Sequence, residues 1–134
     1  MIERQTARGT IAVKTYEPTA YDERSDAPTL VEIYVTENFS GDITGTGEVR
    51  YLQALRSDES AAFCGIERVV GSLAGRQGTF LLQDSGTLEG HQVSGSWFVI
   101  PGASSGELSG LRGEGGFDAQ LGQNATWTLD YWFE

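Results

Sequence analysis

Two acidic residues, Glu67 and Asp84, lie in predicted β-strands at positions that can point toward the apolar interior. Neighbouring residues of a β-strand point to opposite faces, so one member of the pair Glu67-Arg68 must face inward. Asp84 shares parity with Phe80 and Leu82, and it enters the interior if that face lines it. A buried charge must be paired or lie in a wet cavity. Glu67 is therefore either half of a structural ion pair or a cavity acid or base, and Asp84 is either a turn residue or a titrating group.

Two carboxyl groups in one low-dielectric cavity split their pKa values, so that one is protonated near neutral pH and serves as the acid. We therefore predict that Asp84 and Glu67 form a general acid–base pair. Tyr131, on the same strand face as Trp127, is the candidate hydrogen-bond donor to the reacting oxygen, although most tyrosines on such a face are core residues. The apolar side chains expected to line the ligand site and exclude water are Phe63, Phe80, Trp97 and Trp127.

Other chemistry finds little support in the sequence. With one cysteine (Cys64) and one histidine (His91), an internal disulfide is excluded and a zinc site is not expected. Residues 102–106 match G-x-S-x-G, but the nucleophile elbow needs a helix directly after it, and the following glycine-rich segment favours a turn. No metal, phosphate-binding or nucleotide motif is found, so we predict a function without cofactor.

The charge balance limits the partners. Nine basic against 19 acidic residues give a net charge of −10, which disfavours nucleic acids and anionic membranes because both are polyanions. The longest apolar stretch, residues 97–100, is too short to span a membrane, and no signal peptide is evident, so we expect a cytoplasmic protein. We also expect a homodimer formed through one wall, with Trp132 as an exposed aromatic contact.

The elements that position these residues are strands. The 134 residues suit a single domain covering 1–134. Strict alternation at residues 30–37 and 126–133, with β-branched and aromatic runs at 10–16, 61–70, 79–83 and 96–100, predicts an all-β fold. The best helical candidate, residues 51–55, is one turn at most.

Glycine placement predicts how the strands connect. Segments 41–45, 71–75 and 106–110 share the form G-[DSE]-[IL]-x-G, which suits a strand, a tight turn and the next strand. A meander of hairpins that closes on itself removes exposed edges. We predict a single closed, or nearly closed, antiparallel β-barrel of about eight to ten strands.

Three segments, 39–45, 65–80 and 101–113, resemble the bacterial family called domain of unknown function 3224, and the resemblance runs from about residue 21 to 131. That family looks related to the allene oxide cyclase barrels, which implies an interior cavity. The chain departs from the pattern at Gln83-Asp84, where a histidine is expected after the glutamine, and in the loop after Pro101. The family has no general assigned activity.

The resemblance implies a function through related barrels, which act as cyclases without cofactors. We expect a cofactor-independent cyclase or isomerase acting on a hydrophobic, polyketide-like small molecule by acid–base catalysis inside the barrel. The alternative is a non-catalytic barrel that carries an apolar ligand. A carrier needs one orienting polar group in its cavity, whereas a catalyst needs at least two within reach of one substrate.

Overall fold

The chain folds into nine antiparallel β-strands in a computed structural model that describes residues 3–134. The strands are β1 (Gln5–Asp22), β2 (Thr29–Gly41), β3 (Ile43–Leu55), β4 (Ala61–Leu73), β5 (Arg76–Glu89), β6 (Gln92–Val99), β7 (Ser105–Gly106), β8 (Leu111–Gln120) and β9 (Ala125–Phe133). The described residues contain no helix long and apolar enough to cross a membrane.

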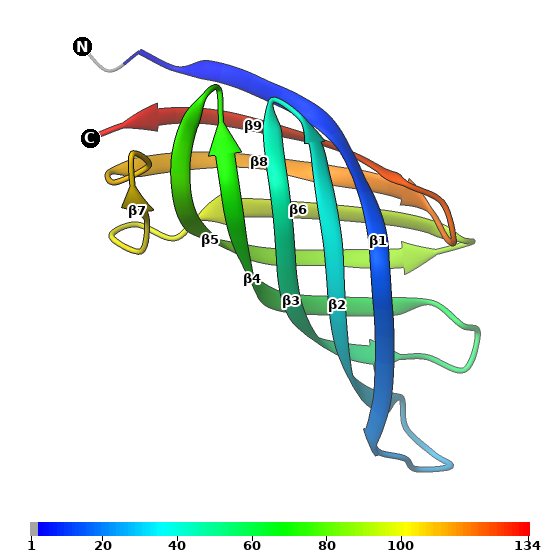
Figure 1. Ribbon diagram of the computed structural model, residues 1–134. Helices are drawn as coiled ribbons and strands as arrows, with labels where there is room; N and C mark the ends of the chain where they lie inside the picture. Colours follow the sequence, from blue (N-terminus) through cyan, green and yellow to red (C-terminus); the bar gives the residue numbers. More distant parts are fainter. Residues whose placement is uncertain (1–2) are drawn as a thin grey trace.

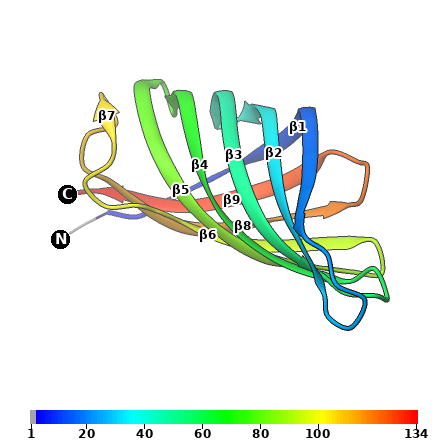
Figure 2. The ribbon, with the colours of Figure 1, turned by 90° about the horizontal axis from the view of Figure 1, so that it is seen from below.

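Eight of these strands close into a barrel, as predicted. The sheet runs β4-β3-β2-β1-β9-β8-β6-β5, and β4 also pairs with β5, which closes the ring; β7 is an extra strand on β5. In Figure 1 the long strands β1 to β5 cross over β6, β8 and β9, and Figure 2 shows β7 at the end where the two termini lie.

In the eight strands of the barrel, buried side chains that point into the interior alternate with more exposed side chains on the outer face. Val31, Ile33 and Val35 of β2 are buried while their neighbours are more exposed, and Trp127, Leu129 and Tyr131 of β9 are buried in the same way. Six aromatic side chains face a glycine on an adjacent strand, where a Cβ would collide with a ring or with backbone. The pairs are Phe39–Gly45, Tyr51–Gly65, Phe63–Gly86, Trp97–Gly115, Phe117–Gly95 and Trp127–Gly9.

The repeated glycine segments do form turns. Gly41, Gly75 and Gly106 adopt φ values of 106°, 85° and 66°, a region that residues with a side chain rarely enter. The expectation for residues 51–55 was wrong: they continue β3 as strand, because pairing with β2 and β4 on both sides outweighs local preference. Strand β1 likewise continues to Asp22 through Pro18, beyond the expected end at Tyr16.

The two ends of the barrel differ in how fully side chains fill them, so a ligand cavity is expected at the less filled end. At the end with the termini, the loop around β7 inserts Leu108, which is completely buried, beside Ile43 and Leu73. That end is filled by packed apolar side chains. At the other end lie the β5–β6 turn and the β8–β9 turn, where Leu121 is exposed.

Candidate functional site

Three acidic side chains lie inside the barrel wall. Glu37 of β2 is 7% exposed, Glu67 of β4 is 0% exposed and Asp84 of β5 is 1% exposed. Asp84 faces inward together with Phe80 and Leu82, and of the pair Glu67-Arg68 it is Glu67 that faces inward, while Arg68 lies on the outer face. Glu37 has the same parity as Val31, Ile33 and Val35, so the alternation that identified this strand could also have identified it.

Glycines make room for this cluster. Glu37 pairs with Gly47 across β2 and β3, and a Cβ on Gly47 would overlap Oε2 of Glu67 and lie 2.9 Å from the ring of Phe39. The bare backbone at Gly47 therefore lets the carboxyl group of Glu67 reach toward β2. No ordinary side chain at this position would leave that space.

A tyrosine joins the cluster in the same way. Tyr51 of β3, Gly65 of β4 and Asp84 of β5 form one row across the sheet. The hydroxyl of Tyr51 donates a hydrogen bond of 3.2 Å to Oδ2 of Asp84, and its ring packs edge-on against Phe63 at a centroid distance of 5.1 Å. Because residues 51–55 were interpreted as a short helical candidate, sequence reasoning missed this residue.

No basic side chain compensates the cluster. Both carboxyl oxygens of Glu67 and Oδ1 of Asp84 are buried without a hydrogen-bond donor among the described residues. Loss of solvation is the main cause that raises the pKa of all three carboxyl groups. Its effect raises the pKa of Asp84 to about 8, although the hydrogen bond from Tyr51 acts in the opposite direction.

Of the three carboxyl groups, Glu67 holds its proton most tightly. Burial, and then hydrogen bonding and charge repulsion from Glu37, raise the pKa of Glu67 well above its usual range. The hydrogen bond to Glu67 has the opposite effect on Glu37 and Asp84, lowering the pKa of each. A protonated Glu67 fits these directions, and it leaves Glu37 as the group that most readily carries the negative charge.

A cavity of about 650 Å³ reaches Glu37 and Tyr51 from the end of the barrel opposite the termini. Its wall includes four aromatic side chains and three amides. These residues are Tyr16, Tyr51, Trp97 and Phe117, with Gln120, Gln123 and Asn124 from the end of β8 and the β8–β9 turn. Glu67 and Asp84 lie behind Glu37 and Tyr51 and do not line the cavity.

Of the four expected wall residues, only Trp97 lines this cavity. Phe80 and Trp127 are buried in the packed core, and Phe63 packs against that core. Tyr131 is not brought to the carboxyl groups: its hydroxyl donates to Oε1 of Gln5 at 2.7 Å, near the filled end. Parity identifies the face of a strand, but the position along the barrel axis depends on strand register.

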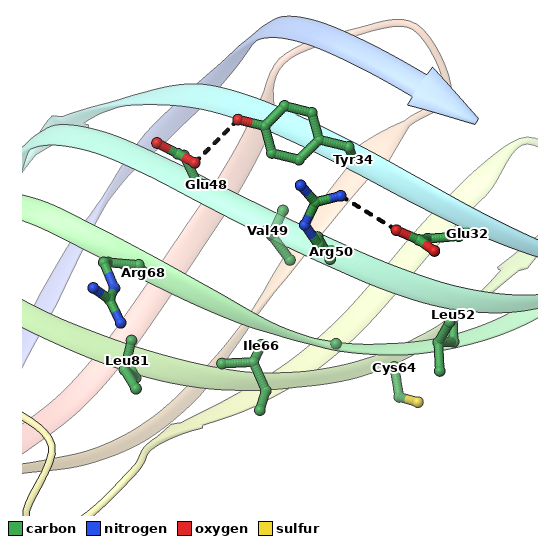
Figure 3. A pocket seen from close by; sticks show the side chains of 11 residues that line it. Glu32, Tyr34, Glu48, Val49, Arg50, Leu52, Cys64, Ile66, Arg68 and Leu81 are labelled. Atoms are coloured by element: carbon green, nitrogen blue, oxygen red, sulfur yellow. Dashed lines mark hydrogen bonds and ion pairs between the residues drawn. The ribbon is translucent and has the colours of Figure 1, made fainter. Parts of the chain in front are cut away.

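The outer wall carries a second depression, shown in Figure 3. This outer groove has a volume of about 750 Å³ across β2 to β5. Here Arg50 contacts Glu32 at 3.2 Å, Tyr34 donates to Glu48 at 3.0 Å, and the Arg50 guanidinium lies over the Tyr34 ring. These polar groups pair with one another on a solvent-exposed surface, so none of them is left unpaired to act on a ligand.

The structure also shows where the G-x-S-x-G segment, His91 and Trp132 lie. The G-x-S-x-G segment forms the turn and short strand β7, where the hydroxyls of Ser105 and Thr79 share a hydrogen bond of 2.5 Å. His91 lies in the β5–β6 turn at the other end of the barrel, so no base supports a serine nucleophile there. Trp132 is half-buried under Arg4, 4.1 Å from its ring centroid; the homodimer stays a prediction.

Fold and site together define a closed eight-stranded β-barrel with an internal carboxyl cluster at the inner end of a cavity. The chain belongs to the family described as a protein of unknown function, DUF3224, whose model matches residues 7–131. No curated protein matches the chain.

A solved structure supports the same assignment. The chain is similar to a protein of unknown function from the DUF3224 family of Shewanella oneidensis MR-1, with 28% identity and a TM-score of 0.83. The alignment covers 98% of this chain and 99% of that one. The family expected from three sequence segments is thus confirmed over most of the chain.

Proposed function

We propose that the protein is a cofactor-independent isomerase or cyclase that moves a proton on a hydrophobic, polyketide-like small molecule inside the barrel. The observation that carries the proposal is the buried cluster of Glu37, Glu67 and Asp84 without a basic partner. Uncompensated acidic groups are costly to bury, and strongly perturbed groups beside a cavity are characteristic of functional sites. The proposal places this activity in the cytoplasm, and the exposed free thiol of Cys64 suits a reducing compartment.

The two groups that line the cavity take the catalytic roles. The carboxylate of Glu37 removes a proton from carbon next to a carbonyl group, and it returns that proton to another carbon of the same molecule. Tyr51 donates a hydrogen bond to the oxygen on which negative charge develops. A cyclisation uses the same pair: Glu37 takes the proton of a hydroxyl group as its oxygen bonds to a carbonyl carbon, the carbonyl double bond becomes a single bond, and the resulting alkoxide takes that proton back to give a cyclic hemiketal.

Glu67 and Asp84 are positioning residues in this scheme. A protonated Glu67 adds no negative charge beside Glu37, so Glu37 keeps the carboxylate form that a base needs. Asp84, with its raised pKa, can donate its own proton to the Tyr51 oxygen across the present 3.2 Å contact, which frees the Tyr51 proton for the substrate. This revises the expected direct roles of Asp84 and Glu67, because neither lines the cavity.

The test uses cyclohex-3-enone as a proton-transfer probe. Its conversion to the conjugated cyclohex-2-enone is followed by ultraviolet absorbance against a buffer blank. Glu37→Gln should lower the catalysed rate by at least ~100-fold, the usual contribution of a general base. Glu48→Gln, on the outer face of β3, is the matched control and should leave the rate unchanged.

The carrier alternative is separated by a binding measurement. Nile red is neutral and fluoresces more strongly in an apolar cavity, so it reports occupancy without chemistry. Binding of Nile red without any acceleration of the enone reaction would favour the carrier. Catalysis that persists in Glu37→Gln would contradict the assignment of Glu37 as the base.

A further inference from the structure

The cavity that contains Glu37 is built for positive charge. Its wall carries one acidic group, and none of the lysine, arginine or histidine side chains of residues 3–134 lines it. The titratable groups nearest to Glu37 are Glu67 from β4, Asp84 from β5 and Tyr51 from β3, all of which are neutral or negative. An anionic ligand would face uncompensated repulsion here.

No positively charged side chain of residues 3–134 pairs with the three carboxyl groups, so a bound cation would be their first positive partner. Glu67 is completely buried, and neither of its carboxyl oxygens accepts a hydrogen bond from a described donor. Oδ1 of Asp84 is in the same condition. A cation beside the Glu37 carboxylate supplies the positive charge that no described side chain provides there.

The rest of the wall selects an organic cation. Tyr16, Tyr51, Trp97 and Phe117 present aromatic rings to the same space, and aromatic faces attract ammonium groups through their quadrupoles. A metal ion is a poorer match, since no three acidic, histidine or cysteine side chains among residues 3–134 form a metal-ligand group. Hard cations also prefer six or more oxygen ligands to an apolar wall.

We propose that the molecule bound in this cavity carries a protonated amine on an apolar frame, with the ammonium group against Glu37 and the frame against the aromatic rings. The inference deepens the proposed function and rests on it only in using the same cavity. The amide side chains of Gln120, Gln123 and Asn124 at the mouth are neutral and do not compete for the ammonium group.

The test compares three probes with the same phenyl frame and different charge. Phenethylamine is a cation at pH 7, 2-phenylethanol is neutral and phenylacetate is an anion; binding of each is measured by titration calorimetry. We expect phenethylamine to bind at least tenfold more tightly than 2-phenylethanol, and phenylacetate to bind more weakly than both.

Variants identify the group responsible. Glu37→Gln should reduce the affinity for phenethylamine to that for 2-phenylethanol while binding of 2-phenylethanol is retained, which also shows that the variant is folded. Glu48→Gln, on the outer face, should preserve the preference for the cation. Retention of that preference in Glu37→Gln would overturn the assignment of the ammonium site to Glu37.

The outcomes distinguish this inference from the proposed function. Equal affinity for phenethylamine and 2-phenylethanol, or binding of none of the three probes, overturns the inference, whereas Glu37-dependent isomerisation of cyclohex-3-enone would still support the proposed function. Selective binding of phenethylamine without isomerisation supports the inference and contradicts the catalytic proposal.

Discussion

Acidic side chains on the outer face of the barrel strands are solvent-exposed and have polar partners, whereas those on the inner face are buried without a basic partner. On the outer face, the side chain of Glu32 is 49% exposed and meets Arg50, while Glu48 accepts a hydrogen bond from half-buried Tyr34. On the inner face, Glu37 and Glu67 are buried beside each other without a basic partner. Successive residues of a strand thus experience water on one side and an apolar interior on the other.

The contrast shows that residue type alone does not decide what a carboxyl group does. An exposed ion pair contributes little, because water and salt screen it. A buried carboxyl group binds its proton more tightly, and this makes folding depend on pH and leaves the group able to exchange a proton with a ligand. Three stability measurements test this difference.

The largest expected effect is the pH dependence of stability caused by Asp84. Its pKa is 3.8 when exposed and about 8 in the fold, so the folded protein holds a proton that the unfolded chain releases between these values. The contribution of Asp84 to stability is therefore fully present below about pH 4, falls as the pH rises from 4 to 8, and levels off above the folded-state pKa of about 8. At about 1.4 kcal/mol per pKa unit, the loss from pH 5 to pH 9 is roughly 4 kcal/mol.

Urea unfolding at pH 5 and pH 9 measures this loss. Asp84→Asn keeps an acceptor for Tyr51 but cannot ionise, so its free energy of unfolding should change much less between the two pH values. Glu48→Gln removes an outer carboxyl group and should keep the slope of the unmodified protein. Equal pH dependence in Asp84→Asn and the unmodified protein would show that Asp84 does not hold a proton in the fold.

A smaller effect is expected from filling the space beside Glu67. In Gly47→Ala the new methyl group overlaps Oε2 of Glu67 and crowds Phe39, and overpacking of this kind costs about 1–3 kcal/mol. Urea unfolding at pH 6 measures the cost. In a Glu67→Asp background the carboxyl group is one methylene shorter, so the same substitution should cost less; an undiminished cost would place the clash elsewhere.

The smallest effect is expected on the outer face. Glu32→Gln removes the partner of Arg50 in an exposed pair, which should change the free energy of unfolding by less than about 1 kcal/mol. The change should shrink further in 1 M sodium chloride, since salt screens exposed charges. A change as large as that of the inner substitutions would remove the distinction between the two faces.

Strand parity accounts for most of what could be predicted from the sequence. Alternation in residues 30–37 and 126–133 placed the correct side chains inside. The same rule linked Asp84 to the face of Phe80 and required one of Glu67 and Arg68 to point inward. The spacing of the glycine segments indicated hairpins, and they close into a barrel. These features depend on one strand and its adjacent turn, so they are visible in a short stretch of sequence.

Parity also applies to Glu37, but parity alone does not show that Glu37 lies beside Glu67. Its proximity to Glu67 depends on Gly47, which lies on the strand between them. Tyr51 was misassigned because its strand character comes from pairing with β2 and β4. Cross-strand neighbours are set by register, which couples residues far apart in the chain.

The sequence by itself therefore determined the fold class and the inner face of most strands, because each follows from the twofold period of a strand. Only the tertiary structure decided which end of the barrel is filled by Leu108 and which is open to a ligand. It also decided that Tyr51, and not Tyr131, meets Asp84. Those properties arise from the closure of eight strands at one register, where the height of a side chain along the barrel depends on every pairing around the ring.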